Sequence, residues 1–230
     1  MSVYQLSTPR AGRRQKASDE EVFAAAQRAM RRRGPHELTL ADIACEAGVT
    51  AGRLVQRFGS KRALMVALSK RFAGSAGPVF ASLRAAHRGP LATLRAYAAC
   101  MADLAPTPEV LLRNLAYLQG DLADETLRSH LVENARATRR EIEALLADAV
   151  AAHELRPEID APSLARTIET IVSGSLTTWA TYRVGPAADW IGRDVEAVLG
   201  PWLERSRAIS SPGAARRRRP AKRSRAAAKR

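Results

Sequence analysis

The chain has 230 residues, of which 46% are hydrophobic and 5% aromatic, and its net charge is +14. No uncharged apolar run reaches the roughly 18–20 residues that a membrane span needs, and residues 1–21 lack the apolar stretch of a secretory signal. Two cysteines, Cys45 and Cys100, do not make a disulfide framework. We therefore expect a cytoplasmic, reduced protein, and the excess of Ala, Leu and Arg predicts an all-α fold.

The charge is distributed unevenly along the chain. Residues 1–75 hold 14 basic and 6 acidic side chains, residues 76–210 hold 14 and 17, and residues 211–230 hold 9 and none. This pattern predicts that the two ends meet a polyanion. Residues 1–17 are interpreted as a flexible basic arm and 208–230 as a disordered polybasic tail. The tail either adds sequence-independent phosphate contacts or only solubilises the chain.

Residues 18–75 carry the signals of several short helices. A capping box at Ser18 opens a helix that Gly34-Pro35 ends, and Thr39 opens a second helix over 40–47. Gly48 suits a tight turn, after which Thr50 caps a third helix over about 51–57 and Ser60 caps another from Lys61 to about Phe72. This order predicts an N-terminal three-helix helix-turn-helix domain that binds DNA.

The third helix presents an outward face suited to reading bases. Arg53, Gln56 and Arg57 are three and four residues apart and share this face. Arginine can bond guanine as a fork and glutamine can bond adenine in the same way, while Lys61 at a helix N-terminus suits a phosphate. A solvated basic helix is the alternative interpretation. The candidate DNA-contacting residues are Thr39, Thr50, Ala51, Gly52, Arg53, Val55, Gln56, Arg57 and Lys61.

Residues 39–64 read TLADIACEAGVTAGRLVQRFGSKRAL, and this segment resembles the TetR family of bacterial transcriptional regulators. The resemblance extends over about residues 18–72. Val55 stands where the family commonly has a tyrosine that contacts the DNA backbone, Arg57 replaces a histidine or tyrosine, and Arg53 replaces a small residue. The resemblance implies a regulator, most often a repressor, that associates with the bacterial nucleoid when it binds DNA. Because these three positions lie on the helix that is expected to contact DNA, the operator sequence of another family member cannot be carried over to this chain.

Breaker residues at 74–78 predict a domain boundary, and longer helices are expected over 91–105, 109–119, 122–153, 161–183 and 187–206. The resemblance implies an effector-binding and dimerisation domain over residues 76–207. Apolar faces on the last two helices independently predict a homodimer through a four-helix bundle; packing within one subunit is the alternative. These apolar residues are Leu164, Ile168, Ile171, Val172, Leu176, Trp179, Trp190, Ile191, Val195, Val198, Leu199, Trp202 and Leu203.

Apolar and aromatic side chains on these helices could line an effector cavity. Ordinary core packing is the alternative for each of them. No pattern identifies the effector. The candidates are Tyr97, Met101, Leu104, Leu115, Leu118, Trp179 and Tyr182.

Other function classes have less support. The chain has no HExxH, CxxC, GxSxG or glycine-rich phosphate loop, so we expect no enzyme, no metal and no cofactor. The basic ends would also suit an architectural DNA-binding protein with weak sequence preference. The Arg53–Gln56 pair and the acidic middle region favour a sequence-specific regulator instead. We expect it to act as a homodimer on a pseudo-palindromic double-stranded DNA operator. We also expect an unknown small molecule to modulate it, and we expect no binding to a membrane.

Overall fold

The structure, a computed structural model, describes residues 17–204. The predicted polybasic tail and nearly all of the predicted basic arm lie outside these residues. Within 17–204 the chain is helical, and its only extended pairing is an isolated antiparallel bridge between Leu155 and Leu203. The all-α prediction is confirmed.

Four helices form the N-terminal part: α1 (Asp19–Arg32), α2 (Leu40–Glu46), α3 (Ala51–Phe58) and α4 (Lys61–Ala73). Their starting points follow from cap residues, because Ser18, Thr39, Thr50 and Ser60 each accept a hydrogen bond from the backbone N–H three residues on. One buried cluster joins the four helices; its members include Val22, Phe23, Ala26, Ile43, Ala44, Leu54, Leu64 and Leu68.

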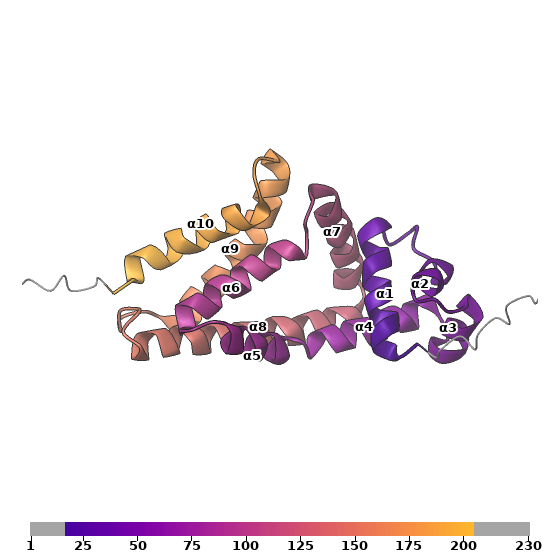
Figure 1. Cartoon of the computed structure of the whole chain (residues 1–230), viewed down its shortest axis with the longest axis horizontal. Coiled ribbons are helices and arrows are strands. Elements are labelled where there is room, and N and C mark those ends of the chain that lie inside the picture. Colours follow the sequence, from indigo (N-terminus) through magenta and orange to yellow (C-terminus); the bar gives the residue numbers. More distant parts are fainter. Residues whose placement is uncertain (1–16, 205–230) are drawn as a thin grey trace, which may run out of the picture.

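The remaining helices are α5 (Ala76–Ala86), α6 (Pro90–Asp103), α7 (Pro108–Ala123), α8 (Glu125–Ala151), α9 (Ala161–Tyr182) and α10 (Ala187–Leu199), followed by a 3-10 turn (Gly200–Trp202). The long α8 runs from the N-terminal helices along the base of the molecule, and α9 and α10 pack together at the far end (Figure 1). A second core cluster fills the space between α5, α6, α8, α9 and α10.

One whole helix and several helix limits differ from the sequence-based expectation. No helix was expected over α5, which begins inside the predicted joint at 74–78: Gly77 and Pro78 lie in its first turn, where the missing N–H of proline breaks no intrahelical bond. Helix α7 continues past Gly120 to Ala123, and Asp124 then both ends α7 and caps α8. Helix α10 ends at Leu199, with Pro201 in the 3-10 turn that follows.

Seven of the thirteen apolar side chains named for the dimer prediction are buried inside the subunit, and the other six are half-buried. All of Leu164, Ile168, Val172, Trp179, Ile191, Val195 and Leu199 are buried in the second core cluster. The exposed face of α9 instead carries small residues at helical spacing, namely Thr167, Thr170, Gly174 and Thr177. A partner surface on α9 would therefore consist of small polar side chains.

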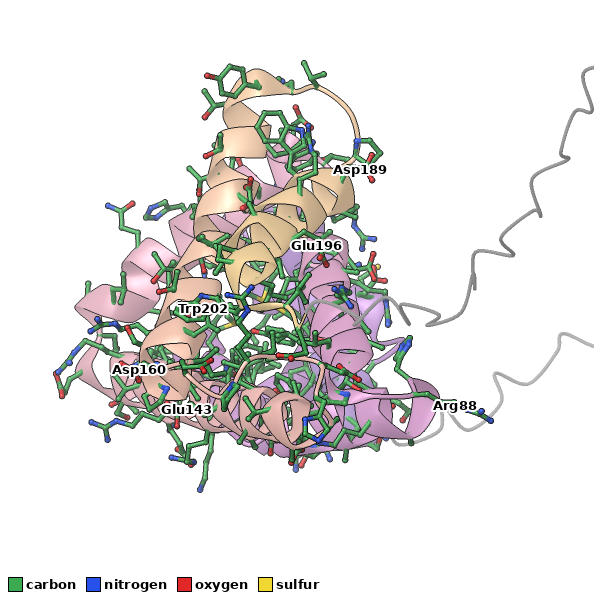
Figure 2. All side chains as sticks on the ribbon, turned by 90° about the vertical axis from the view of Figure 1, so that its left-hand side faces the viewer. Arg88, Glu143, Asp160, Asp189, Glu196 and Trp202 are labelled. Carbon is green, nitrogen blue, oxygen red and sulfur yellow. The ribbon has the colours of Figure 1, made fainter. Side chains whose placement is uncertain are left out.

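The two ends of the described chain lie at opposite ends of the molecule (Figure 1). The backbone N–H of Arg156 donates to Trp202 O at 2.9 Å, and that of Glu204 donates to Glu154 O at 3.0 Å. These bonds hold the last described residues against the α8–α9 connection, with Trp202 visible in the end-on view of Figure 2. In residues 17–204 no helix has the length and apolar character to cross a membrane.

Candidate nucleic-acid interface

Helix α3 is set by a tight turn on one side and a buried anchor on the other. Gly48 has φ 67°, a conformation that favours glycine, and it connects α2 to the segment leading to Thr50. Thr50 Oγ1 accepts from Arg53 N at 3.4 Å and starts the helix. Leu54 is 1% exposed and fixes one face of α3 to the core. The opposite face is consequently held rigidly toward solvent.

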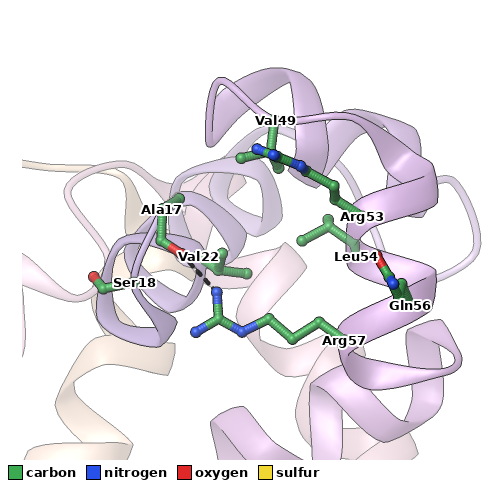
Figure 3. A pocket seen from close by; sticks show the side chains of 8 residues that line it. All are labelled: Ala17, Ser18, Val22, Val49, Arg53, Leu54, Gln56 and Arg57. Atoms are coloured by element: carbon green, nitrogen blue, oxygen red, sulfur yellow. Dashed lines mark hydrogen bonds between the residues drawn. The ribbon is translucent and has the colours of Figure 1, made fainter. Parts of the chain in front are cut away.

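Arg53 and Gln56 occupy this solvent-facing side. Both side chains are exposed, and neither has a side-chain hydrogen bond or ion pair within residues 17–204. They line one wall of a cavity of about 510 Å³ between α3 and the start of α1 (Figure 3). Their donors and acceptors are therefore available to an external partner.

Arg57 is engaged inside the domain. Its guanidinium pairs with Asp19 at 2.5 Å, donates to Ala17 O at 2.6 Å and lies 5.6 Å from the centroid of the Phe58 ring. Figure 3 shows the bond to Ala17 crossing the cavity. These contacts tie α3 to the start of α1, so Arg57 braces the face that Arg53 and Gln56 present.

Lys61 is likewise directed inward. Its Nζ donates to Pro35 O at 2.9 Å and Leu38 O at 2.7 Å, which uses two of its three donors on the α1–α2 connection. The sequence analysis expected Lys61 to face a phosphate; its acceptors lie 26 and 23 residues away along the chain and come close only in the folded protein.

The other predicted DNA-contacting residues divide between caps and exposed surface. Thr39 caps α2 in a reciprocal box with Asp42. Ala51 is half-buried, whereas Gly52 and Val55 are exposed. A Cβ at Gly52 would meet no atom within 4 Å, so the backbone there is open to a close approach.

The arginines at the end of α1 hold α2 in place. Arg28 pairs with Glu46 at 2.7 Å, Arg32 also pairs with Glu46, and Arg33 pairs with Asp42 at 3.2 Å. Hydrogen bonds from Arg28 and Arg32 lower the pKa of Glu46. Part of the basic charge of this domain is thus neutralised by its own acidic side chains, whereas Arg53 has no acidic partner in residues 17–204.

Helix α7 connects the N-terminal helices to the rest of the molecule. The Tyr117 hydroxyl donates to Arg33 O at 2.9 Å, and Arg113 donates to Arg31 O at 3.1 Å. The Tyr117 ring belongs to the N-terminal core cluster, and burial raises its pKa to about 12. Sequence reasoning missed both residues, since neither breaks the helical pattern of α7.

A groove of about 470 Å³ lies between α6, α7, α8 and α9. Four predicted effector residues come together in its wall: Tyr97, Met101, Leu104 and Leu118. The other three lie elsewhere. Leu115 is exposed outside the groove, Trp179 is buried and donates to Gly185 O at 2.8 Å, and Tyr182 stacks on Trp190 at 5.5 Å.

Five polar residues of the groove were not predicted: Arg128, Asn134, Thr138, Glu169 and Ser173. Asn134 lines it, and its Oδ1 is buried without a hydrogen-bond partner in the described part of the chain. Glu169 also lines it and pairs with Arg139 at 2.5 Å. The groove therefore combines apolar walls with an amide, two hydroxyls, a carboxylate paired with Arg139 and a guanidinium paired with Glu125. Among the described residues no group of His, Cys, Asp and Glu could hold a metal ion.

Comparison with known proteins gives two family matches. Residues 22–68 match the family described as bacterial regulatory proteins, tetR family, and residues 116–193 match the tetracyclin repressor-like C-terminal domain. The first match contains α2, α3 and most of α1 and α4; the second contains α8, α9 and parts of α7 and α10. A search of curated proteins finds no match.

Solved structures show the same fold at low sequence identity. A TetR transcription regulator from Haloarcula marismortui has a TM-score of 0.66 and 17% identity, over 80% of this chain and 97% of that one. SmeT, the repressor of the Stenotrophomonas maltophilia multidrug efflux pump SmeDEF, has a TM-score of 0.59 and 19% identity, over 83% and 93%. FadR from Bacillus subtilis in complex with stearoyl-CoA has a TM-score of 0.59 and 16% identity, over 79% and 97%.

Proposed function

Because the chain belongs to the TetR family of bacterial regulatory proteins, we propose that it is a sequence-specific, homodimeric transcriptional repressor that a small molecule releases from DNA. One observation carries this proposal: Arg53 and Gln56 are exposed and unpaired within residues 17–204, on a helix whose other face is anchored by Leu54. The protein acts on the bacterial nucleoid in the cytoplasm and carries out no catalysis of its own.

In this proposal α3 enters the major groove of an operator. Arg53 and Gln56 contact base edges, and Thr50, Ala51 and Gly52 approach the phosphates through the backbone at the start of α3. Thr39 and Val55 border the contact, and Arg57 holds α3 at a fixed angle to α1 through Asp19. The remaining donor of Lys61 is left for a phosphate.

The proposed dimer uses the two C-terminal helices. Thr167, Thr170, Gly174 and Thr177 leave a face of α9 without bulky side chains, so the backbone of a second α9 can approach closely. Two subunits related by a two-fold axis then read a pseudo-palindromic site with half-sites about one helical turn apart.

The effector would bind in the groove between α6, α7, α8 and α9. The solved FadR of Bacillus subtilis is in complex with stearoyl-CoA, a ligand with a long apolar chain. Leu118 and Leu122 of α7 line the groove here, while Arg113 and Tyr117 of the same helix bind α1. A ligand that favours another position of α7 would thereby shift α1, and with it the orientation of α3 relative to the DNA.

Fluorescence anisotropy tests this function directly. The full chain is titrated against the intergenic duplex beside its own gene and against a scrambled duplex, over a salt series. We expect a preference above about a thousandfold for the intergenic duplex, as sequence-specific regulators show. Equal affinity with a steep salt dependence would support the architectural alternative, and no binding at moderate salt would contradict DNA binding by the free protein.

A further inference from the structure

A second, smaller cavity lies where the N-terminal helices meet the rest of the molecule. Its volume is about 170 Å³, and helices α1, α4, α7 and α8 all contribute to its wall. The lining is mostly apolar and adaptable: Met30, Met65, Leu68, Phe72 and Leu131. An engineered cavity of about 150 Å³ binds benzene, so this space accommodates one ring or a short chain.

One carboxylate faces this apolar wall. Asp121 of α7 lines the cavity and is half-buried, and it has no ion-pair or hydrogen-bond partner within residues 17–204. The neighbouring Asp124, by contrast, is neutralised by Arg62 at 2.7 Å. Burial, and secondarily Asp124, raise the pKa of Asp121. A partly desolvated carboxylate without a partner gains stabilisation of its charged form from a cation placed beside it.

We propose that this cavity binds a small organic cation, with its ammonium group on Asp121 and its apolar body against Met30, Met65 and Phe72. An anion would be repelled by Asp121, and a neutral molecule would leave the carboxylate unpaired. Gln27 and Ser69 also line the cavity and supply polar partners for the remaining N–H groups. The ring of Phe72 adds a surface that attracts cations.

Such a ligand would touch both parts of the molecule at once. Gln27, Met30 and Met65 belong to α1 and α4, which position α3, whereas Asp121 and Leu131 belong to α7 and α8. The bound cation would hold these helix pairs at one relative orientation. This site is separate from the groove between α6, α7, α8 and α9, since the two share only Leu131 among their lining residues.

Isothermal titration calorimetry on the full chain tests the site with two probes of nearly equal size. Benzylammonium carries the charge at neutral pH, and benzyl alcohol is its neutral counterpart. We expect benzylammonium to bind on the order of tenfold more tightly. Asp121→Asn should remove this preference, whereas Asp148→Asn, which changes an exposed acid of α8 outside every cavity named here, should keep it.

Three results would overturn the proposal: equal affinity for the two probes, no binding of either, or a preference that survives Asp121→Asn. The last result would place the responsible carboxylate elsewhere, for example at Glu169. The comparison of the two probes on the unmodified chain needs no variant, so it remains decisive if Asp121→Asn does not fold. Because the calorimetry contains no DNA, its outcome is independent of whether the protein recognises an operator.

Discussion

At the scale of single residues, three basic side chains of α3 and the start of α4 have different environments. Arg57 and Lys61 are held by acceptors of the protein itself, at Asp19 and at the α1–α2 connection. Arg53 has no such partner among the described residues. A side chain that already has a good partner loses it on binding DNA, so Arg53 gains the most from a base.

Arg53→Ala should therefore relax base preference at one position of each half-site. The expected loss of operator affinity is about 1–3 kcal/mol, the usual contribution of a good bidentate contact. Anisotropy titrations against a set of operator variants measure it. Arg53→Lys keeps the charge without the fork, so its affinity for scrambled DNA should stay unchanged; an undiminished base preference in Arg53→Ala would contradict the assigned role.

A glycine at the start of α6 is a second residue-scale constraint. Gly89 has φ 91°, and a Cβ there would lie 2.7 Å from Glu154 Oε1. The same carboxylate caps α6 by accepting from Leu91 N at 3.0 Å. A side chain at residue 89 would thus strain the backbone and displace the cap.

Gly89→Ala should lower the free energy of unfolding by about 1–3 kcal/mol, as measured by urea denaturation. Gly120→Ala is the matched control, because Gly120 lies within α7 and a Cβ there meets no atom within 4 Å. The control should raise stability by up to about 1 kcal/mol. Loss of stability in both variants, or in neither, would contradict this account.

At the scale of elements, α7 is the helix that belongs to both parts of the molecule. Tyr117 enters the N-terminal core, while Leu118 and Leu122 face the groove on the other side. The hydroxyl of Tyr117 and the guanidinium of Arg113 both end on carbonyls at the end of α1. Movement of α7 is consequently passed to α1 through hydrogen bonds as well as through packing.

Tyr117→Phe removes the hydroxyl and leaves the ring in the core. The carbonyl of Arg33 then loses its donor, and we expect a loss of about 1 kcal/mol in the free energy of unfolding. Hydrogen exchange should also increase at the end of α1. The control is Tyr182→Phe, whose ring is 65% exposed and should change neither quantity; equal effects in the two variants would argue against coupling through Tyr117.

Most elements were predictable because their signals are local. The caps at Ser18, Thr39, Thr50 and Ser60 placed α1 to α4 to within one or two residues, and periodicity placed Leu54 inside and Arg53 outside. The partners of Arg57 and Lys61 and the role of Tyr117 were not predictable. Each depends on a residue between 23 and 84 positions away that only the folded chain brings close.

At the scale of the whole molecule, assembly should depend on the small-residue face of α9. Gly174→Arg places a long charged side chain in the middle of that face, so we expect a monomer by analytical ultracentrifugation together with loss of operator binding. Gly77→Arg puts the same side chain on exposed α5, where a Cβ is equally unhindered, and should leave the dimer intact. A dimeric Gly174→Arg variant would place the interface elsewhere.

The polybasic C-terminal segment should raise the affinity for DNA through its charge, to the same extent for any base sequence. Deleting residues 211–230 removes 9 basic side chains and no acid. Affinity for operator and scrambled duplexes should fall by the same factor, and the slope of log affinity against log salt should flatten by roughly 0.9 for each phosphate that the segment no longer neutralises. The control is a chain of the same length in which residues 211–230 are replaced by Gly and Ser. An unchanged slope of log affinity against log salt after the deletion would mean that this segment does not bind DNA.

The separation of the two chain ends has a practical consequence for labelling. Ala17 borders the reading helix and accepts a hydrogen bond from Arg57, whereas Glu204 is fixed at the α8–α9 connection at the opposite end (Figure 1). A fluorescent protein fused ahead of residue 17 would crowd the DNA-facing side. One placed directly after Glu204, in a chain that lacks residues 205–230, would leave that side clear, so this fusion is the form in which operator occupancy can be followed by microscopy in living cells.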